Sequence, residues 1–179
     1  MDEIVKLALE KWPNVPDCYG WLGLDSRGDW YLRDDLVQSK GEFTKSKGSR
    51  LEHRKLIEFI NRNYAQDTDG SFYFQNGPQK VYVELELTPW ILKFDHENNL
   101  MTHTQLYIKW KNMYTDEVGR VYVDTDLGIG LIHTMEMSTF ADQLLKEKWT
   151  LNEVKIQDLE STFGFVKSPS QKKSQSLTG

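Results

Sequence analysis

The residues whose types and spacing could do chemistry are mainly carboxylates on segments with strand-like alternation. Glu84 and Glu86 stand two residues apart within Lys80–Leu87, and Asp124 and Asp126 have the same spacing. Side chains two residues apart in a strand lie on one face of the sheet. Two such carboxylates perform acid-base catalysis when a dry pocket separates their pKa values, whereas on a solvated face they only add charge.

The same alternation predicts an aromatic and acidic sheet face opposite the core. From it we select a set of candidate binding residues: Tyr82, Glu86, His103, Tyr107 and Asp124, with Trp90 as a wall. Tyrosine gives a large rigid contact area with a polar tip, and acids favour a cationic or hydrogen-bond-donating partner. Histidine would make binding sensitive to pH near its reference pKa of about 6.5. The alternative is that helices cover this face or that tyrosine pairs only stabilise the sheet.

Other catalytic patterns are weak in this chain. Cys18 is the single cysteine, and without an active-site signature around it we interpret it as a packed side chain. The sequence contains no Gly-x-Ser-x-Gly elbow, phosphate loop or dinucleotide fingerprint. The four histidines lack the spacing of metal ligands, so we expect no metal and no cofactor.

One turn pattern occurs three times, and it predicts the elements that position these residues. It reads Asp-x-x-Gly-x-apolar-Tyr-apolar and begins at Asp25, Asp67 and Asp116. Aspartate accepts hydrogen bonds from the backbone of its own turn, and glycine adopts a positive φ at little steric cost. An alternating segment follows each copy, so the pattern predicts tight turns between antiparallel strands.

The remaining chain contributes helices and further strands. Helical spacing covers Asp2–Lys11 and Ser138–Lys148, and the capping box Ser49-Arg-Leu-Glu52 predicts a third helix that runs to about Ala65. Asn76-Gly77 joins two alternating segments as a hairpin. Further strands are predicted over Trp90–Phe94, His103–Trp110, Arg120–Asp124 and Leu127–Thr134.

Together these elements indicate an α+β fold: an antiparallel β meander or roll, in two lobes, with about three helices packed on the sheets. We expect one α+β domain over residues 1–166, with possible lobes 1–94 and 95–166. Lys167–Gly179 is rich in Ser, Lys and Gln, so we expect a disordered tail at 167–179.

The composition fits a soluble globular protein. The net charge of −5 disfavours nucleic acid or an anionic membrane as the partner, because binding to polyanions needs clustered Lys and Arg. One cysteine, an acidic start and no apolar run of membrane-spanning length favour the cytoplasm.

Several blocks resemble an uncharacterised bacterial family of small proteins. These are the Cys18-Tyr-Gly-Trp-Leu22 block, the Phe74-Gln-Asn-Gly-Pro-Gln79 block and the closing Phe163–Pro169. More loosely, the order of motifs is similar to a second bacterial family of unknown function, whose two-lobed α+β architecture the resemblance implies here. Neither resemblance implies a reaction, a cofactor or catalytic residues.

We therefore interpret the function as unknown and favour a non-catalytic binding or interaction protein that uses the aromatic and acidic sheet face. The partner would be a small molecule or another protein, and the sequence does not indicate an oligomeric state. The alternative is an enzyme that acts on a small polar or cationic metabolite, with Glu86, His103 or Asp124 as acid-base residues.

Overall fold

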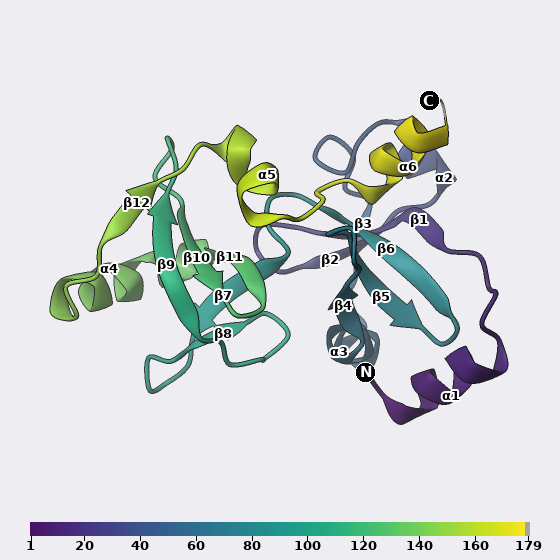
Figure 1. The fold of residues 1–179 in the computed structure, drawn as a ribbon, viewed down its shortest axis with the longest axis horizontal. Coiled ribbons are helices and arrows are strands. Elements are labelled where there is room, and N and C mark those ends of the chain that lie inside the picture. Colours follow the sequence, from purple (N-terminus) through teal and green to yellow (C-terminus); the bar gives the residue numbers. More distant parts are fainter. Residues whose placement is uncertain (178–179) are drawn as a thin grey trace. The chain divides into compact units, whose positions relative to one another are not determined.

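The computed structural model describes residues 1–177 and divides into two units, each built on a six-stranded sheet (Figure 1). Unit 1 comprises Met1–Asp25, Asp29–Glu86 and the segment from Phe165 onward, and unit 2 comprises Ser26–Gly28 and Leu87–Gly164. The two-lobed α+β class predicted above is confirmed. The boundary differs from the expected lobes, because the chain changes unit after Glu86 and returns to the first unit near its end.

Unit 1 has the strand order β3-β2-β1-β6-β5-β4, in which only the β1–β6 pair is parallel. Its elements are α1 Glu3–Lys11, β1 Cys18–Leu24, β2 Trp30–Leu32, α2 Asp35–Ser39, β3 Ser49–Arg50, α3 Arg54–Arg62, β4 Tyr64–Gln66, β5 Phe72–Asn76, β6 Gln79–Leu85 and α6 Pro169–Leu177.

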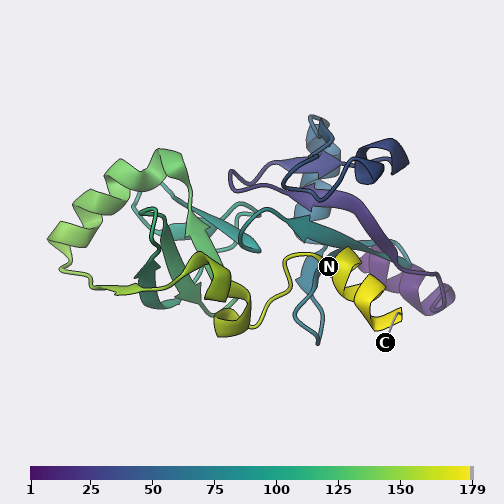
Figure 2. The same ribbon diagram turned by 90° about the horizontal axis from the view of Figure 1, so that it is seen from above.

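Two helices pack on opposite faces of this sheet (Figure 2). Phe74 of β5 meets Phe59 of α3 edge to face, with ring centroids 5.4 Å apart. The neighbouring residue Tyr73 therefore points to the other face, where its cross-strand partner Tyr82 lies beside Pro169 of α6. Both faces of β5 and β6 are thus covered.

The start predicted for the helix that follows the capping box at Ser49 was wrong. Ser49-Arg50 pairs with β2 as an edge strand, and α3 begins only at Arg54, where the Nδ1 atom of His53 accepts a hydrogen bond from the Leu56 amide at 3.2 Å. A capping-box pattern is short, and here strand pairing prevailed over it. The first helix forms as predicted, but Ile4 and Leu7 are exposed rather than packed.

Unit 2 has the strand order β12-β9-β10-β11-β7-β8, with parallel pairs at β11–β7 and β12–β9. Its elements are β7 Trp90–Phe94, β8 Leu100–Thr102, β9 Trp110–Thr115, β10 Val121–Thr125, β11 Gly128–Ile132, the 3-10 helix η1 Thr134–Glu136, α4 Met137–Lys146, β12 Leu151–Glu153, the 3-10 helix η2 Ile156–Asp158 and α5 Leu159–Phe163.

The predicted strand over His103–Trp110 was wrong, because that stretch is mostly loop between β8 and β9. Period-two alternation assigns Leu106 and Trp110 to the core, whereas both are exposed in the structure. It assigns a larger set to the core as well, and all of that set are buried except Val81, which is half-buried: Trp30, Phe72, Phe74, Val81, Val83, Leu85, Val121 and Val123.

The three Asp-x-x-Gly turns form as predicted, with positive φ at Gly28, Gly70 and Gly119. A fourth turn of the same kind begins at Asp95. There the Asn98 amide donates to the Asp95 carbonyl at 3.1 Å, and Asn98 takes the position of the glycine with φ of 63°. Asparagine is one of the few residues that adopt this conformation readily, which is why a pattern written for glycine missed the turn.

The chain end differs from the predicted disordered tail, because α6 forms within Lys167–Gly179; residues 178 and 179 lie outside the described part. Six α-helices over residues 1–177 also exceed the three expected, since α2 and α5 are too short to show periodicity. None of the described helices combines the length and apolar character needed to cross a membrane.

Candidate functional site

The six residues selected from the sequence belong to different units. Tyr82 and Glu86 lie in unit 1, whereas Trp90, His103, Tyr107 and Asp124 lie in unit 2.

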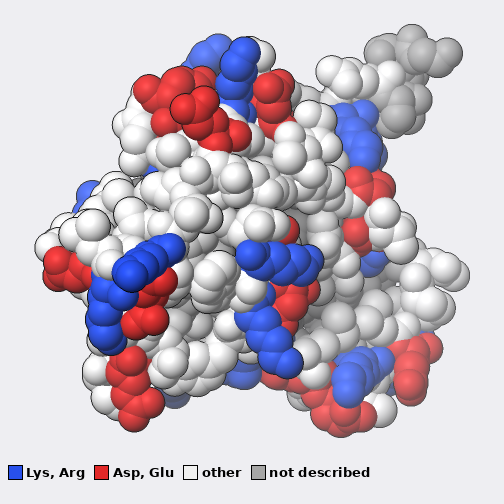
Figure 3. Space-filling model, turned by 60° about the vertical axis from the view of Figure 1, so that its left-hand side comes forward, with Lys and Arg blue, Asp and Glu red and all other residues white. Residues whose placement is uncertain are grey.

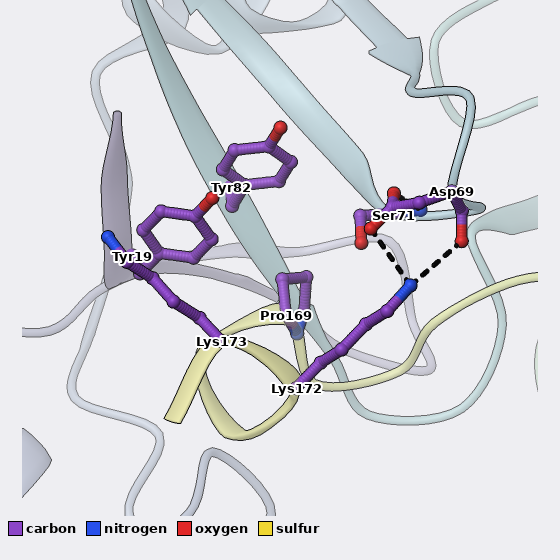
Figure 4. A pocket seen from close by; sticks show the side chains of 7 residues that line it. All are labelled: Tyr19, Asp69, Ser71, Tyr82, Pro169, Lys172 and Lys173. Atoms are coloured by element: carbon purple, nitrogen blue, oxygen red, sulfur yellow. Dashed lines mark hydrogen bonds and ion pairs between the residues drawn. The ribbon is translucent and has the colours of Figure 1, made fainter. Parts of the chain in front are cut away.

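Tyr82 is buried beneath α6 (Figure 4). Its ring stacks on Tyr19 with centroids 4.5 Å apart, and its hydroxyl donates to the Asp67 carboxylate at 2.5 Å. Burial, with the neighbouring Asp67 carboxylate, raises the pKa of Tyr82 far above its usual range. The expected partial exposure of this ring is not seen, because the chain end covers it.

Glu86 follows β6 and is engaged by Lys47. The two side chains form an ion pair at 2.9 Å, and the same Lys47 amine lies 3.5 Å from the carboxylate of the buried Asp25. Although burial acts in the opposite direction, the hydrogen bond to Glu86 raises the pKa of Lys47. This arrangement neutralises Glu86 internally instead of presenting it to a partner.

Trp90 and His103 lie together in unit 2, with ring centroids 5.9 Å apart. Trp90 is buried and donates through Nε1 to the Leu127 carbonyl at 2.7 Å. The Nδ1 atom of His103 accepts from the Ile91 amide at 3.3 Å, and burial lowers the pKa of His103 to about 3. At neutral pH this imidazole is uncharged, so it does not titrate near 6.5 as the sequence led us to expect.

Tyr107 and Asp124 complete the set. Tyr107 is 64% exposed, and its hydroxyl donates to Asp95 at 3.1 Å. The backbone amide of Asn99 and the Tyr107 hydroxyl are among the donors that lower the pKa of Asp95 to about 2. Asp124 is half-buried in β10, opposite Ile129 of β11.

Unit 2 holds a cavity of about 610 Å³ that the sequence analysis did not locate. We call it the acidic cleft. Its walls are the end of β9 with the turn that follows, the end of β12, and η2 with α5. The lining residues are Tyr114, Thr115, Asp116, Glu117, Glu153, Val154, Lys155, Asp158 and Thr162.

Parallel pairing of β12 with β9 builds the cleft. The register places Glu153 beside Thr115, and the Val154 amide donates to the Thr115 carbonyl at 3.0 Å. Beyond this point a carboxylate oxygen of Glu117 accepts from the Ile156 amide at 3.1 Å, which holds the start of η2. The Tyr114 ring packs edge-on against Phe163 of α5, at 5.1 Å between centroids.

Four carboxylates line this cleft against one lysine. Asp116 is held rigidly, because it accepts from the amides of Val118 and Arg120 and from the Tyr122 hydroxyl at 3.0, 2.8 and 2.7 Å. The other three, Glu117, Glu153 and Asp158, are exposed and form no ion pair with any of the described residues. The cleft therefore carries a negative charge that the described protein does not neutralise.

The sequence contained only part of the signal for this cleft. Asp116 belongs to a recognised turn pattern, but Glu153 and Asp158 lie in segments whose local sequence was ambiguous between helix and strand. Their approach to Asp116 depends on the β12–β9 pairing. Among residues 1–177 no three His, Cys, Asp or Glu side chains are placed so that they could share a metal ion.

On the face of the molecule drawn in Figure 3, acidic and basic side chains are interspersed.

Comparison with known proteins gives a family but no activity. No curated protein matches the chain. A solved structure, that of a DUF1285 family protein from Silicibacter pomeroyi DSS-3, aligns at 15% identity with a TM-score of 0.46, over 79% of this chain and 84% of that one. The profile of the family DUF2944, described as "Protein of unknown function (DUF2946)", matches residues 1–170. The chain therefore belongs to this family of proteins of unknown function.

Proposed function

We propose that this protein is a binding protein whose acidic cleft takes a cationic ligand, one that carries amine or guanidinium groups. The observation that carries the proposal is the set of three carboxylates, Glu117, Glu153 and Asp158, around a cavity of about 610 Å³ with no internal ion pair. Carboxylates brought together in this way repel one another, and a bound cation relieves the repulsion.

The shape and chemistry of the cleft support a small ligand. Its volume lies in the range of roughly 300–1,000 Å³ that is typical of small-molecule sites. Tyr114 offers an aromatic ring against which a cation can pack. The net charge of −5 favours the approach of cations over that of nucleic acid.

The cysteine content supports a cytoplasmic location. Cys18 is the single cysteine of the sequence and forms no disulfide, which is compatible with a reducing compartment. The resemblance of the sequence blocks supports a bacterial origin. In this proposal the protein acts without chemistry of its own, as a receptor or carrier of the cation or as a docking module for a Lys- or Arg-bearing segment of another protein.

The test is calorimetric titration of the full chain with the linear triamine spermidine and with arginine amide. We expect binding that weakens as salt rises, because exposed charges are screened. The double variant Glu153→Gln with Asp158→Asn should weaken binding by on the order of tenfold, at about 0.5–1 kcal/mol for each exposed charge.

The matched control is Asp142→Asn, which removes an exposed carboxylate of α4 that does not line the cleft. It should bind as the unmodified chain does. Equal weakening by the control would reduce the effect to general charge attraction, and the absence of binding of either cation at low salt would overturn the proposal.

A further inference from the structure

The sheet face beneath α6 is rich in tyrosine. We call it the tyrosine face, formed by Tyr19 of β1, Tyr73 of β5 and Tyr82 of β6. Tyr82 stacks on Tyr19 and contacts Tyr73 at 5.9 Å between centroids. α6 lies over this face and contacts both β1 and β6.

Three polar anchors hold α6 on the tyrosine face. The buried Glu84 carboxylate accepts from the Ser168 hydroxyl and from the Ser170 amide, and so caps the first turn of the helix. The Lys172 amine bonds to the Asp69 carboxylate at 2.8 Å, and that of Lys173 lies 4.1 Å from the centroid of the Tyr19 ring (Figure 4). The hydrogen bond from Lys172 lowers the pKa of the Asp69 carboxyl group.

Over residues 169–175, the part of α6 whose side chains the structure describes, Pro169 is the only apolar residue. Pro169 is buried, whereas Gln171, Lys172, Lys173 and the next two residues are exposed. A cavity of about 170 Å³ remains between the helix and the tyrosine rings. A helix of nine residues is marginal without packing, and the ion pair that anchors it joins side chains 46% and 49% exposed.

The segment before α6 is fixed much more firmly. The Val166 amide donates to the Gly70 carbonyl at 3.0 Å, and the Leu85 amide donates to the Lys167 carbonyl at 2.8 Å. The backbone pairing with the sheet described here ends at Lys167, and beyond it side-chain contacts, the anchors described above among them, hold α6. This difference places a hinge between Lys167 and the helix.

We infer that α6 is a replaceable ligand of the tyrosine face, which is an interaction surface for a lysine-bearing helical segment of a partner protein. The partner segment would present what α6 presents: a hydroxyl or amide donor for Glu84, an amine for Asp69 and a second amine over Tyr19. A partner with an apolar side chain that fills the 170 Å³ cavity would displace α6, because it adds packing that α6 lacks.

Cys18 is a natural reporter of this surface. It is the only cysteine, begins β1 and is half-buried, and burial raises the pKa of its thiol while the nearby Lys173 acts in the opposite direction. Opening of α6 therefore increases the access of reagents to this thiol. The rate of alkylation by iodoacetamide in the native full chain, followed over pH and extrapolated to the fully ionised thiol, measures that opening apart from the charge of Lys173.

The first experiment compares the full chain with its Lys172→Ala, Lys173→Ala double variant. Loss of the ion pair and of the cation–π contact should speed the alkylation of Cys18 on the order of tenfold. Hydrogen exchange should show the α6 amides losing protection while those of β6 keep it. The matched control is Gln171→Ala, which alters an exposed side chain of the same helix and should leave both measurements unchanged.

The second experiment supplies the helix in trans. A synthetic peptide of residues 166–177 at millimolar concentration should slow the alkylation of Cys18 in the double variant towards the rate of the unmodified chain. The same peptide with alanine in place of both lysines should have no effect. Circular dichroism confirms that the double variant is folded.

Two results would overturn the inference. One is an alkylation rate that the double variant leaves unchanged, with α6 amides that exchange only when the whole unit unfolds. The other is a folded, faster-reacting double variant that the lysine peptide does not protect. Neither depends on the acidic cleft, so the cation titration above and these measurements fail independently.

Discussion

The turns at Asp67 and Asp116 begin with the same sequence pattern but end in different surroundings. In unit 1 the carboxylate of Asp69, within the turn, meets the Lys172 amine of α6. In unit 2 the corresponding turn carries Glu117 and borders a cleft whose other acids, Glu153 and Asp158, meet no cation among the described residues. The Asp69 carboxylate of the first turn is thus paired with a lysine of the same chain. The Glu117 carboxylate of the second turn keeps a charge that an external cation can neutralise.

The turns share a second feature, a tyrosine hydroxyl bound to the first aspartate. Tyr122 donates to Asp116 from six residues downstream, whereas Tyr82 donates to Asp67 from the neighbouring strand β6. Of these two tyrosines only Tyr122 belongs to the repeated pattern; at Asp67 the hydroxyl comes from Tyr82, the cross-strand partner of the pattern residue Tyr73. This explains why several acids and tyrosines that alternation assigned to a binding face are engaged internally.

The largest expected effect comes from the two turn aspartates. Asp116→Ala should lower the free energy of unfolding by about 3 kcal/mol, because it leaves a buried tyrosine hydroxyl and two amides without their acceptor. Asp67→Ala should cost about 1.5 kcal/mol, since its side chain is less buried. Urea unfolding of both variants measures the difference; equal costs would show that the two turns are equivalent.

The tyrosine partners should follow the same order at a smaller scale. Tyr122→Phe should cost about 2 kcal/mol and Tyr82→Phe about 1 kcal/mol, because each change removes one donor from a carboxylate and the Asp116 carboxylate is more deeply buried than that of Asp67. Thermal and urea unfolding provide the measurement. A larger cost at Tyr82 would indicate that the stack with Tyr19 depends on the hydroxyl.

Acid should weaken unit 1 through Asp67. Hydrogen bonds from Tyr82 and Lys80 hold the pKa of Asp67 below the ordinary value of 3.8, so protons bind the unfolded chain more readily. This contribution is complete well above pH 3.8 and is lost as the pH falls below it. In urea titrations between roughly pH 5 and pH 2.5, Asp67→Asn should reduce the acid loss of stability by about 1 kcal/mol. A pH profile parallel to that of the unmodified chain would contradict this.

The smallest effect on stability comes from giving unit 2 the cation that unit 1 already has. Glu153→Lys should raise the free energy of unfolding by at most about 0.5 kcal/mol, since exposed charges interact weakly. It should nevertheless abolish spermidine binding. Retained binding in the calorimeter would place the cation site elsewhere and break the comparison between the two turns.

The parts of this protein that the sequence by itself determined are local. The three Asp-x-x-Gly turns, the Asn76–Gln79 turn and the buried positions of β5, β6 and β10 follow from φ preferences and from period-two alternation, which act within a few residues. The α+β class follows from them, because tight turns between alternating segments pair strands in antiparallel fashion.

Tertiary structure alone decided what lies on the second face of each strand. Alternation separates two faces but does not say which one water reaches, so Tyr82 and Glu84 were assigned to an open face that α6 covers. The sequence of α6 carries almost no apolar residue, and only a complementary surface with Glu84, Asp69 and Tyr19 orders it. The acidic cleft likewise exists because β12 pairs with β9 across about 40 residues of chain, a contact that no local pattern encodes.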